Sequence, residues 1–403
     1  MKNIAYLFFF NPFFAFINAV RNYGYKWSKN IVWMYVVFFG YTMDKPHEKD
    51  SSRYVDRLVY LHNSPQSFEL FQLTLFDEES GQIDIYQPLL TYVVSLFTEN
   101  GDILFAVFGL FFGFFYSRNI WFLFDELKDK LDRNLWLLLL TFLSVLGFWT
   151  LDGVRMWTAA HMFFYGAYQF YIRGKKWHVI TIFLTCLVHF SFVLPIGLFL
   201  GFYVVRFVRK YLYYAYLGSF FVTQINLGFV QNLVKTYMPE FIAPKVSTYV
   251  SDEYAESYSE GASSYVWYMQ FYRTSINWFL FVLITFIFFK HYKKMEKNDR
   301  MVTLFSFSMF YISVANIVAL IPSGGRFLYI GQMFAIAFIF AFYAKYANRE
   351  IKKFTKAFIP LLVFFVIISV RVCFDSLTVG SVVMNPIMMF FGNVTIPLIS
   401  FLK

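Results

Sequence analysis

Apolar stretches recur along the whole chain, and short polar or charged segments separate them. A stretch of about 20 apolar residues is long enough to cross the hydrocarbon core of a bilayer as a helix. Backbone polar groups find no water in that core, so a crossing segment must satisfy them internally as a helix. The pattern predicts spans near residues 4–20, 30–43, 102–122, 134–151, 156–172, 177–189, 192–205, 210–231, 274–292, 301–320, 327–346, 357–375 and 380–402.

These spans predict an all-α polytopic membrane protein, with about 11 to 13 transmembrane helices in a single domain over residues 1–403. Composition supports this class, because 59% of the residues are hydrophobic and 15% are charged. Such a chain is too apolar for a water-soluble domain. The two cysteines, Cys186 and Cys373, lie inside apolar runs and provide neither a disulfide framework nor a cysteine-based zinc site.

Lys and Arg residues gather in short loops between the predicted spans and indicate which face each loop occupies. Cytoplasmic loops of membrane proteins carry an excess of these residues. The five clusters assigned to the cytoplasm are Arg21, Lys26 and Lys29; Arg173, Lys175 and Lys176; Arg206, Arg209 and Lys210; Lys290, Lys293, Lys294, Lys297 and Arg300; and Lys345, Arg349, Lys352, Lys353 and Lys356. This distribution accounts for the net charge of +10 without nucleic acid as a partner.

Two long hydrophilic loops, residues 44–87 and 232–272, carry more acidic than basic residues. By the same rule, they lie on the opposite face. We expect a multi-pass protein of the bacterial inner membrane, in which both loops are periplasmic.

A topology that keeps all five basic clusters on one face requires a turn inside the apolar stretch 177–205. The turn falls around His189, which then lies at the periplasmic rim. For the number of crossings to keep all five clusters on one face, residues 88–97 must also not cross the membrane, and we expect them to form a re-entrant or interfacial helix. In the alternative topology, 88–97 crosses and 177–205 is one long helix. Arg155 is then cytoplasmic, and only the cluster at 173–176 is misplaced.

Three basic residues, Arg155, His189 and Arg326, lie outside these clusters at the predicted periplasmic rim. A charge at membrane depth costs about 2.5 to 3.5 kcal/mol unless it is paired, so such residues often have a function. Arg326 also follows a Pro-Ser-Gly-Gly segment, which frees backbone N–H groups for an anion. The structural alternatives are an Arg155–Asp152 ion pair that closes a turn, a packed His189 and a snorkelling Arg326.

The periplasmic loops contribute carboxylates and tyrosines. Carboxylates near a cationic rim can orient or deprotonate a sugar hydroxyl, although loop charges are ordinarily solvated surface. Tyrosine rings accept the C–H face of a sugar or anchor the chain at the interface. The residues concerned are Asp50 and Asp84 in the first loop and Tyr249, Tyr254, Tyr258, Tyr265, Tyr268 and Tyr272 in the second.

Motifs for several common chemistries are absent from the sequence. It contains no Walker-type loop, no GxGxxG after a strand, no HExxH and no Cys/His cluster with metal-ligand spacing. We therefore expect no metal ion and no cofactor. His161, which lies inside a predicted span, fits a packed helix contact better than a ligand.

At these residues the chain resembles the EpsG family, a branch of the Wzy-like bacterial polysaccharide polymerases. Three local patterns, in this order, carry the resemblance. They are Asp50, Ser51, Arg53 and Tyr54 with Asp84, Tyr86 and Pro88; Arg155, Ala159 and Ala160 with His189 and Ser191; and Arg326 with Tyr329. Such families commonly have Gln after the first Arg, whereas Met156 follows Arg155 here.

The resemblance implies a metal-independent polymerase of the membrane glycosyltransferase type, with a GT-C-like architecture. Such an enzyme joins oligosaccharide repeat units carried on undecaprenyl diphosphate into capsular, exopolysaccharide or O-antigen polymer at the periplasmic face. Its implied partners are the lipid-linked donor and acceptor and membrane lipids, with a chain-length regulator and a flippase as further candidates. The alternatives are a lipid-linked oligosaccharide flippase and a membrane O-acyltransferase of the same pathway.

The resemblance also implies roles for the candidate residues. Arg155 and Arg326 are expected to bind the diphosphate, because guanidinium groups donate bidentate hydrogen bonds to phosphate oxygens. His189 is expected to act as general base or to position the acceptor hydroxyl, with Asp50 as the rival carboxylate. The residues expected to bind sugar are Arg53, Tyr54 and Asp84.

Overall fold

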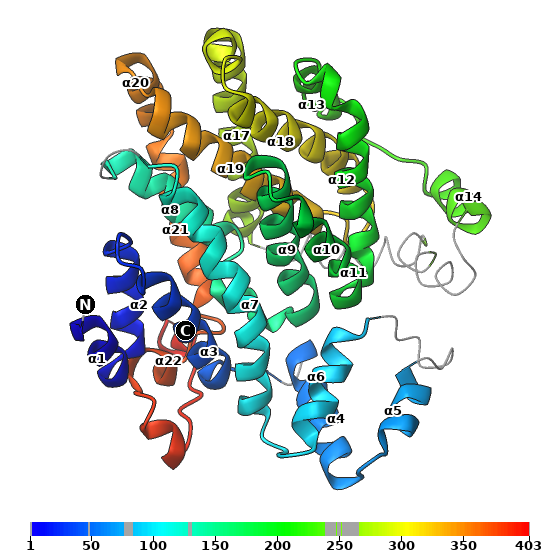
Figure 1. The fold of residues 1–403 in the computed structure, drawn as a ribbon, viewed down its shortest axis with the longest axis vertical. Coiled ribbons are helices and arrows are strands. Elements are labelled where there is room, and N and C mark those ends of the chain that lie inside the picture. Colours follow the sequence, from blue (N-terminus) through cyan, green and yellow to red (C-terminus); the bar gives the residue numbers. More distant parts are fainter. Residues whose placement is uncertain are drawn as a thin grey trace.

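The computed structural model is a bundle of helices (Figure 1) and describes residues 2–46, 49–75, 84–127, 131–237, 247, 251 and 266–402. Over these residues the only β-type pairing is an isolated bridge between Thr378 and Pro397. The predicted all-α class is therefore confirmed.

Six helical segments of the described chain are long and apolar enough to cross a membrane. They are α7 (Gly101–Phe124), α8 (Arg133–Val145) with η1 (Phe148–Asp152), α12 (Val193–Val205) with its flanking turns, α17 (Trp267–Met295), α18 (Asp299–Val318) and α19 (Arg326–Tyr346). A seventh span is formed if α20 (Arg349–Ala357) and α21 (Ile359–Cys373), bent by 52°, count as one. A multi-pass membrane protein is thus confirmed.

Other predicted spans are shorter or broken helices. They are α1 (Lys2–Phe10) and α2 (Pro12–Arg21), α3 (Ser28–Thr42), α9 (Val154–Ala167) with the π-helical turn η2 (Tyr168–Ile172), α10 (Val179–Phe183) with α11 (Thr185–Val188), and α13 (Leu212–Ser219) followed by α14 (Leu227–Tyr237). A single helix over 4–20 is wrong, because Pro12 begins a new helix whose N-cap Asn11 accepts a bond from the Phe14 N–H. A continuous helix over 210–231 is also wrong, since residues 222–226 are not helical.

The predicted span at 380–402 is wrong as well. This segment forms the short helix α22 (Val379–Val383) and the 3₁₀ turns η6 (Met388–Phe391) and η7 (Leu398–Phe401). Thr378 caps α22, and its hydroxyl donates to the Thr42 carbonyl at 2.7 Å. Asn11 donates to the Val382 carbonyl at 2.9 Å. The C-terminal segment therefore packs back against α2 and α3 (Figure 1).

The helices α3 and α7 pack closely along most of their length. Gly40 on α3 faces the Phe105 carbonyl, and a Cβ at Gly109 would lie 2.9 Å from the Val36 carbonyl oxygen. Small residues permit this approach, which is a common means of helix association in membranes. The pair holds α7 in place, and α7 in turn packs against α9.

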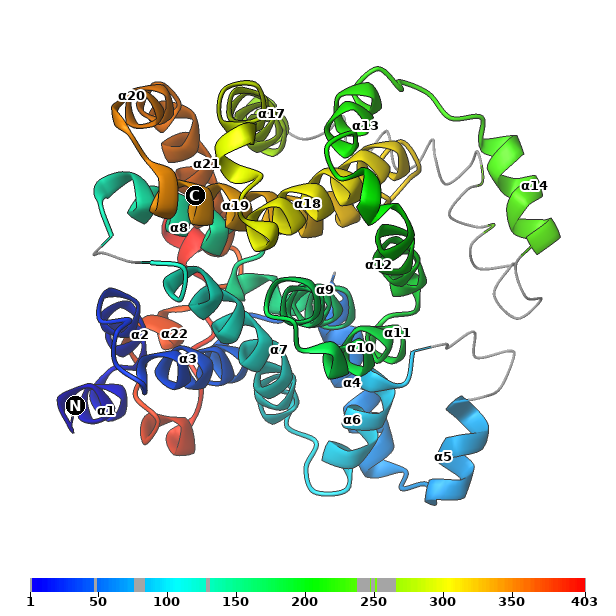
Figure 2. The ribbon, with the colours of Figure 1, turned by 45° about the horizontal axis from the view of Figure 1, so that its top comes forward.

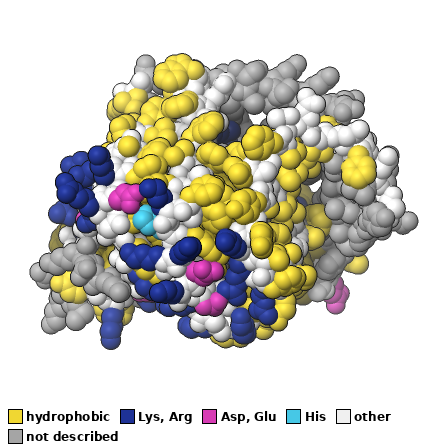
Figure 3. Space-filling view, turned by 90° about the horizontal axis from the view of Figure 1, so that it is seen from above, with side chains coloured by type: hydrophobic (Ala, Val, Ile, Leu, Met, Phe, Trp, Pro, Cys, Tyr) yellow, Lys and Arg dark blue, Asp and Glu magenta, His cyan; other side chains and the backbone are white. Residues whose placement is uncertain are grey.

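The basic clusters share one end of the bundle, which we call the basic end (top in Figure 1; Figure 3). Several residues of these clusters form ion pairs with carboxylates of the α7–α8 loop, α18 and α20. The pairs are Arg173–Asp125 at 2.9 Å, Arg300–Glu126 at 3.3 Å, Lys290–Glu350 at 3.4 Å, Lys352–Asp132 at 3.6 Å and Arg209–Asp299. The Tyr23 carbonyl, in the first cluster's loop, accepts from Trp121 near the same end of α7 at 3.3 Å.

The opposite end, which we call the site end, carries the part of the first long loop that the structure describes. This part forms α4 (Asp50–Asn63) and α5 (Phe68–Leu75) before the chain enters α6 (Tyr86–Ser95). At ten residues, α6 is about 15 Å long, or half the thickness of a hydrocarbon core. It packs against α4 and α7 and does not cross the bundle, as the preferred topology predicts.

The turn predicted around His189 is also present. α10 and α11 lead from the basic end to the site end, and α12 leads back (Figure 1). One long helix over 177–205 is wrong, because the His189 backbone is extended, with φ −150° and ψ 116°. Arg155 and Arg173 lie at opposite ends of α9 and η2, roughly 27 Å apart at 1.5 Å per residue.

Candidate functional site

The Asp84 carboxylate is the centre of a polar cluster at the site end. Its Oδ2 atom accepts from Arg155 Nη1 at 2.8 Å and lies 3.1 Å from His189 Nδ1. Its Oδ1 atom accepts from the Phe190 backbone N–H at 2.6 Å. The structure therefore brings together three of the residues that the sequence predicts, namely Asp84, Arg155 and His189.

Three separate elements position these side chains. Arg155 lies in the first turn of α9, which packs against α7, α10, α11 and α19 (Figure 2). His189 lies between α11 and the 3₁₀ turn η4 (Phe190–Phe192). The residue that precedes α6 contacts this turn, since the Ile85 N–H donates to the Leu187 carbonyl at 3.0 Å. Backbone and side-chain bonds thus hold Asp84 against the His189 turn.

Burial and charge make the cluster strongly coupled. The Asp84 side chain is 5% exposed, whereas those of His189 and Arg155 are 19% and 33% exposed. Burial alone would raise the pKa of Asp84, but the hydrogen bond and charge of His189, the Arg155 guanidinium and the Phe190 N–H together lower it. Asp84 is therefore an ionised acceptor at neutral pH.

The ionised carboxylate fixes the tautomer of His189. A carboxylate can only accept, so Nδ1 carries the proton that points at Asp84. In the neutral ring, Nε2 is then left as a proton acceptor. An imidazole oriented in this way by a carboxylate is a common arrangement for a general base.

Tyr54 extends the cluster toward α4. Its hydroxyl lies within hydrogen-bonding reach of the Arg155 guanidinium, and its ring contacts Phe108 on α7 at 6.3 Å between centroids. The predicted sugar-binding residue Tyr54 is therefore beside Arg155. Tyr86 is partly buried close by, and its buried hydroxyl lies beside Thr158 on α9.

Asp50 and Arg53 lie outside the contacts of this cluster. They pair with each other in the first turn of α4, with side chains 47% and 76% exposed. The turn-closing pair between Arg155 and Asp152 does not form either, because Asp152 bonds Lys49 at 3.2 Å and Arg155 bonds Asp84. The first loop therefore contributes Asp84 and Tyr54 to the cluster.

Arg326 begins α19, as the breaker segment predicts, and its Nη2 atom donates to Ser323 Oγ at 3.5 Å. Ser323 has a positive φ of 62°. The next residues of α19 pack against the elements that carry His189 and Arg155. Phe327 contacts Phe192 at 6.3 Å, and Tyr329 contacts Trp157 at 5.6 Å between ring centroids. No hydrogen bond or ion pair between the described residues joins the exposed Arg326 side chain to Asp84, Arg155 or His189.

A family model described as the EpsG family matches residues 50–379. The chain belongs to the EpsG family. The match covers most of the chain and includes every candidate residue from Asp50 to Arg326. It makes the protein a membrane protein of the polysaccharide polymerase type, related to glycosyltransferases. No curated protein and no solved structure matches it.

One feature of this EpsG family protein departs from the expected pattern, namely Met156 after Arg155. Met156 is buried, at 6% exposure, and its sulfur lies 4.0 Å from the Ser191 hydroxyl. The residue therefore packs against the second member of the His-x-Ser element and not against an open part of the cluster.

Other candidates have structural roles or lie elsewhere. His161 is fully buried, with Nε2 3.2 Å from the Leu146 carbonyl and Nδ1 3.3 Å from Asn119, so it is a packed helix contact. Tyr249, Tyr254, Tyr258 and Tyr265 are outside the described residues. Tyr272, on α17, stacks on Phe365. In the described ranges, no group of three or more His, Cys, Asp or Glu residues could hold a metal ion.

Sequence reasoning misses the central position of Asp84. The partners of its carboxylate are 71 and 105 residues away, and no local pattern reveals such pairs. It also misses the role of the Phe190 N–H. The sequence marks Asp84 only as a loop carboxylate and as the first residue of the Asp84, Tyr86 and Pro88 pattern.

Proposed function

We propose that this protein joins oligosaccharide repeat units carried on undecaprenyl diphosphate into a polysaccharide, at the periplasmic face of the bacterial inner membrane. The observation that carries the proposal is the cluster of Asp84, Arg155 and His189 at the end opposite the basic clusters. By the positive-inside rule the basic end faces the cytoplasm, so the site end faces the periplasm.

The reaction transfers a glycan from its lipid diphosphate to an acceptor hydroxyl. The hydroxyl oxygen forms a bond to the anomeric carbon of the donor glycan, and the bond from that carbon to the diphosphate oxygen breaks. The acceptor loses its proton to a base, and the lipid diphosphate leaves with the bonding electron pair. The site must therefore supply a proton acceptor and fixed positive charge.

His189 is the proposed proton acceptor, through Nε2. Asp84 is the proposed positioning residue, because it holds Nδ1 and stabilises the imidazolium that forms. This role replaces direct sugar binding as the proposal for Asp84. Asp50 is the weaker candidate for a base, since it is exposed and already paired with Arg53.

Arg155 is the proposed donor to the departing diphosphate. One guanidinium nitrogen bonds Asp84, and the side chain remains 33% exposed, so further N–H groups can bind phosphate oxygens. Arg326, at the start of α19 on the same end, is proposed to bind the second phosphate. Tyr54 and Arg53 on α4 are proposed to contact sugar. The positive charge comes from side chains, so the proposed reaction needs no metal ion.

The two alternative functions, a flippase and an O-acyltransferase, require their functional residues at other positions in the membrane. A flippase places functional charges near the membrane midplane, where both faces can reach them. An acyltransferase that takes its donor from the cytoplasm needs a histidine open to the basic end. The cluster lies at the site end, which favours the polymerase. We propose the lipid-linked donor and acceptor as ligands, with a flippase and a chain-length regulator as partners.

Polymer length in the native host tests the proposal. Arg155→Ala and His189→Ala are expected to leave single repeat units in place of long chains. Arg371→Ala and His62→Ala are matched controls, because these residues lie outside the cluster, and they should give normal chains. Chains of normal length from both Arg155→Ala and His189→Ala, with each protein present in the membrane, would remove the site assignment.

A further inference from the structure

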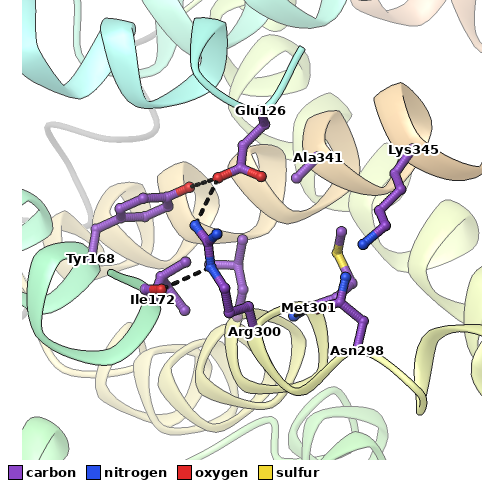
Figure 4. A pocket seen from close by; sticks show the side chains of 9 residues that line it. Glu126, Tyr168, Ile172, Asn298, Arg300, Met301, Ala341 and Lys345 are labelled. Atoms are coloured by element: carbon purple, nitrogen blue, oxygen red, sulfur yellow. Dashed lines mark hydrogen bonds and ion pairs between the residues drawn. The ribbon is translucent and has the colours of Figure 1, made fainter. Parts of the chain in front are cut away.

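A cavity of about 210 Å³ lies beside the Arg300–Glu126 ion pair at the basic end (Figure 4). It lies between the α7–α8 loop, the π-helical turn η2, the start of α18 and the end of α19. Its lining residues are Glu126, Tyr168, Ile172, Asn298, Arg300, Met301, Leu304, Ala341 and Lys345. The proposed polymerase reaction uses none of them.

The lining of this cavity carries more positive than negative charge, with Arg300 and Lys345 against Glu126. Arg300 Nε donates to the Ile172 carbonyl at 2.9 Å, and Nη2 lies 3.3 Å from Glu126 Oε1. The Tyr168 hydroxyl donates to the same Glu126 oxygen at 3.0 Å. The one carboxylate of the lining is therefore occupied by Arg300 and Tyr168. These contacts hold the guanidinium in place at the cavity wall.

Lys345 supplies a second positive charge. Its side chain extends from α19 toward Asn298 (Figure 4). No carboxylate among the residues that the structure describes forms an ion pair with it, and its ammonium group lies 5.5 Å from the centroid of the neighbouring Tyr346 ring. The ammonium group is thus available to an anion in the cavity.

The start of α18 adds a third favourable feature. Asn298 is the N-cap of this twenty-residue helix, and its side chain accepts from the Met301 N–H. The N-terminal end of a helix carries partial positive charge and favours anions. Leu304 and Ala341 add apolar side chains to the lining. The cavity therefore combines cationic and apolar side chains.

We propose that this cavity binds the phosphate of an anionic phospholipid from the cytoplasmic leaflet, with Lys345, Arg300 and the α18 N-terminus around the phosphate. Leu304 and Ala341 contact the glycerol and the upper acyl chain. Anionic lipids are concentrated at the face where the basic end lies, and basic pockets between helices bind their headgroups. This site is independent of the proposed polymerase site.

Lipid binding to the full-length protein tests this proposal. Purified protein in a neutral detergent is titrated with phosphatidylglycerol and, in parallel, with phosphatidylcholine, and bound lipid is counted by native mass spectrometry. A third arm uses inorganic phosphate in place of lipid. Stabilisation by phosphate, with displacement of phosphatidylglycerol, would identify a soluble phosphate as the ligand of the same site. Binding of phosphatidylglycerol alone would identify the lipid.

Two variants and one control locate the site. Lys345→Gln is expected to weaken phosphatidylglycerol binding roughly fivefold, as expected for one basic residue near an anionic group. Ala341→Leu fills the cavity without a change of charge and should weaken it as well. Lys353→Gln removes a charge from an exposed position on α20 of the same end and should have no effect. Equal loss in Lys345→Gln and Lys353→Gln, or no saturable site in the wild type, would overturn the proposal.

Discussion

Asp84 and Arg155, 71 residues apart, form a 2.8 Å ion pair that joins the end of the first polar loop to the start of α9. The same carboxylate oxygen meets His189 on the turn between α11 and α12. A single buried group thus fixes the positions of a guanidinium and an imidazole at one end of the bundle. The proposed chemistry depends on this shared partner.

The first prediction concerns acid stability. The folded-state pKa of Asp84 is lower than its usual value, which is about 3.9. Its ionised form therefore stabilises the fold fully above that value, and the contribution is lost as the pH falls toward the folded-state pKa. Thermal unfolding in detergent should show a stability difference between wild type and Asp84→Asn that is constant near neutral pH and shrinks below about pH 4. A difference that grows with acid would contradict the assignment.

The second prediction concerns the coupling of Asp84 to Arg155. Arg155→Ala leaves a buried carboxylate without its cation and should destabilise the fold by about 3 to 5 kcal/mol. Adding Asp84→Asn to that variant should restore part of the lost free energy of unfolding. A double-mutant cycle on unfolding in detergent should give an interaction energy of about 0.5 to 3 kcal/mol. Strictly additive effects would show that the pair is absent.

The third prediction tests the packing that positions α7. Gly40→Ala places a methyl group against the Phe105 carbonyl and should destabilise the protein by about 1 to 3 kcal/mol, as overpacking does. Gly197→Ala on α12 is the matched control, because a Cβ there meets nothing within 4 Å. Unfolding temperatures of the two variants measure the difference. Equal values would rule out the close α3–α7 approach.

Apolar pattern and length predict most of the long helices well. The predicted spans at 301–320 and 327–346 correspond to α18 and α19 within about two residues, because their apolar runs end at clear polar or Gly-rich breaks. The pattern fails at 380–402. Hydropathy there resembles that of a span, but Pro386, Gly392 and Pro397 lie in non-helical stretches after α22 ends at Val383, and side-chain bonds to Thr42 hold the segment against α3.

The candidate site is predictable in part for a similar reason. The cost of a charge in an apolar context draws attention to Arg155 and His189, and the structure joins them. The partner that joins them is not predictable, because Asp84 is one of many acidic residues in a polar loop. Asp50 shares that loop and a comparable local pattern, yet it faces outward.

The fourth prediction concerns the sides of the membrane. In a variant without Cys186 and Cys373, a cysteine at the exposed position 53 should react with a membrane-impermeant maleimide added to intact cells with a permeable outer layer. A cysteine at position 175, at the basic end, should react only after the inner membrane is opened. Reversed labelling would place the cluster on the cytoplasmic face and contradict the proposed function.

The most direct test is polymerisation in vesicles that contain only the purified protein and its lipid-linked repeat unit. Wild-type protein and Asp56→Asn, an exposed control on α4, should release undecaprenyl diphosphate and form long glycan. Asp84→Asn and His189→Gln should slow this by about 10² to 10⁴, the usual contribution of a positioned general base. Chains formed at the wild-type rate by both variants would contradict the account.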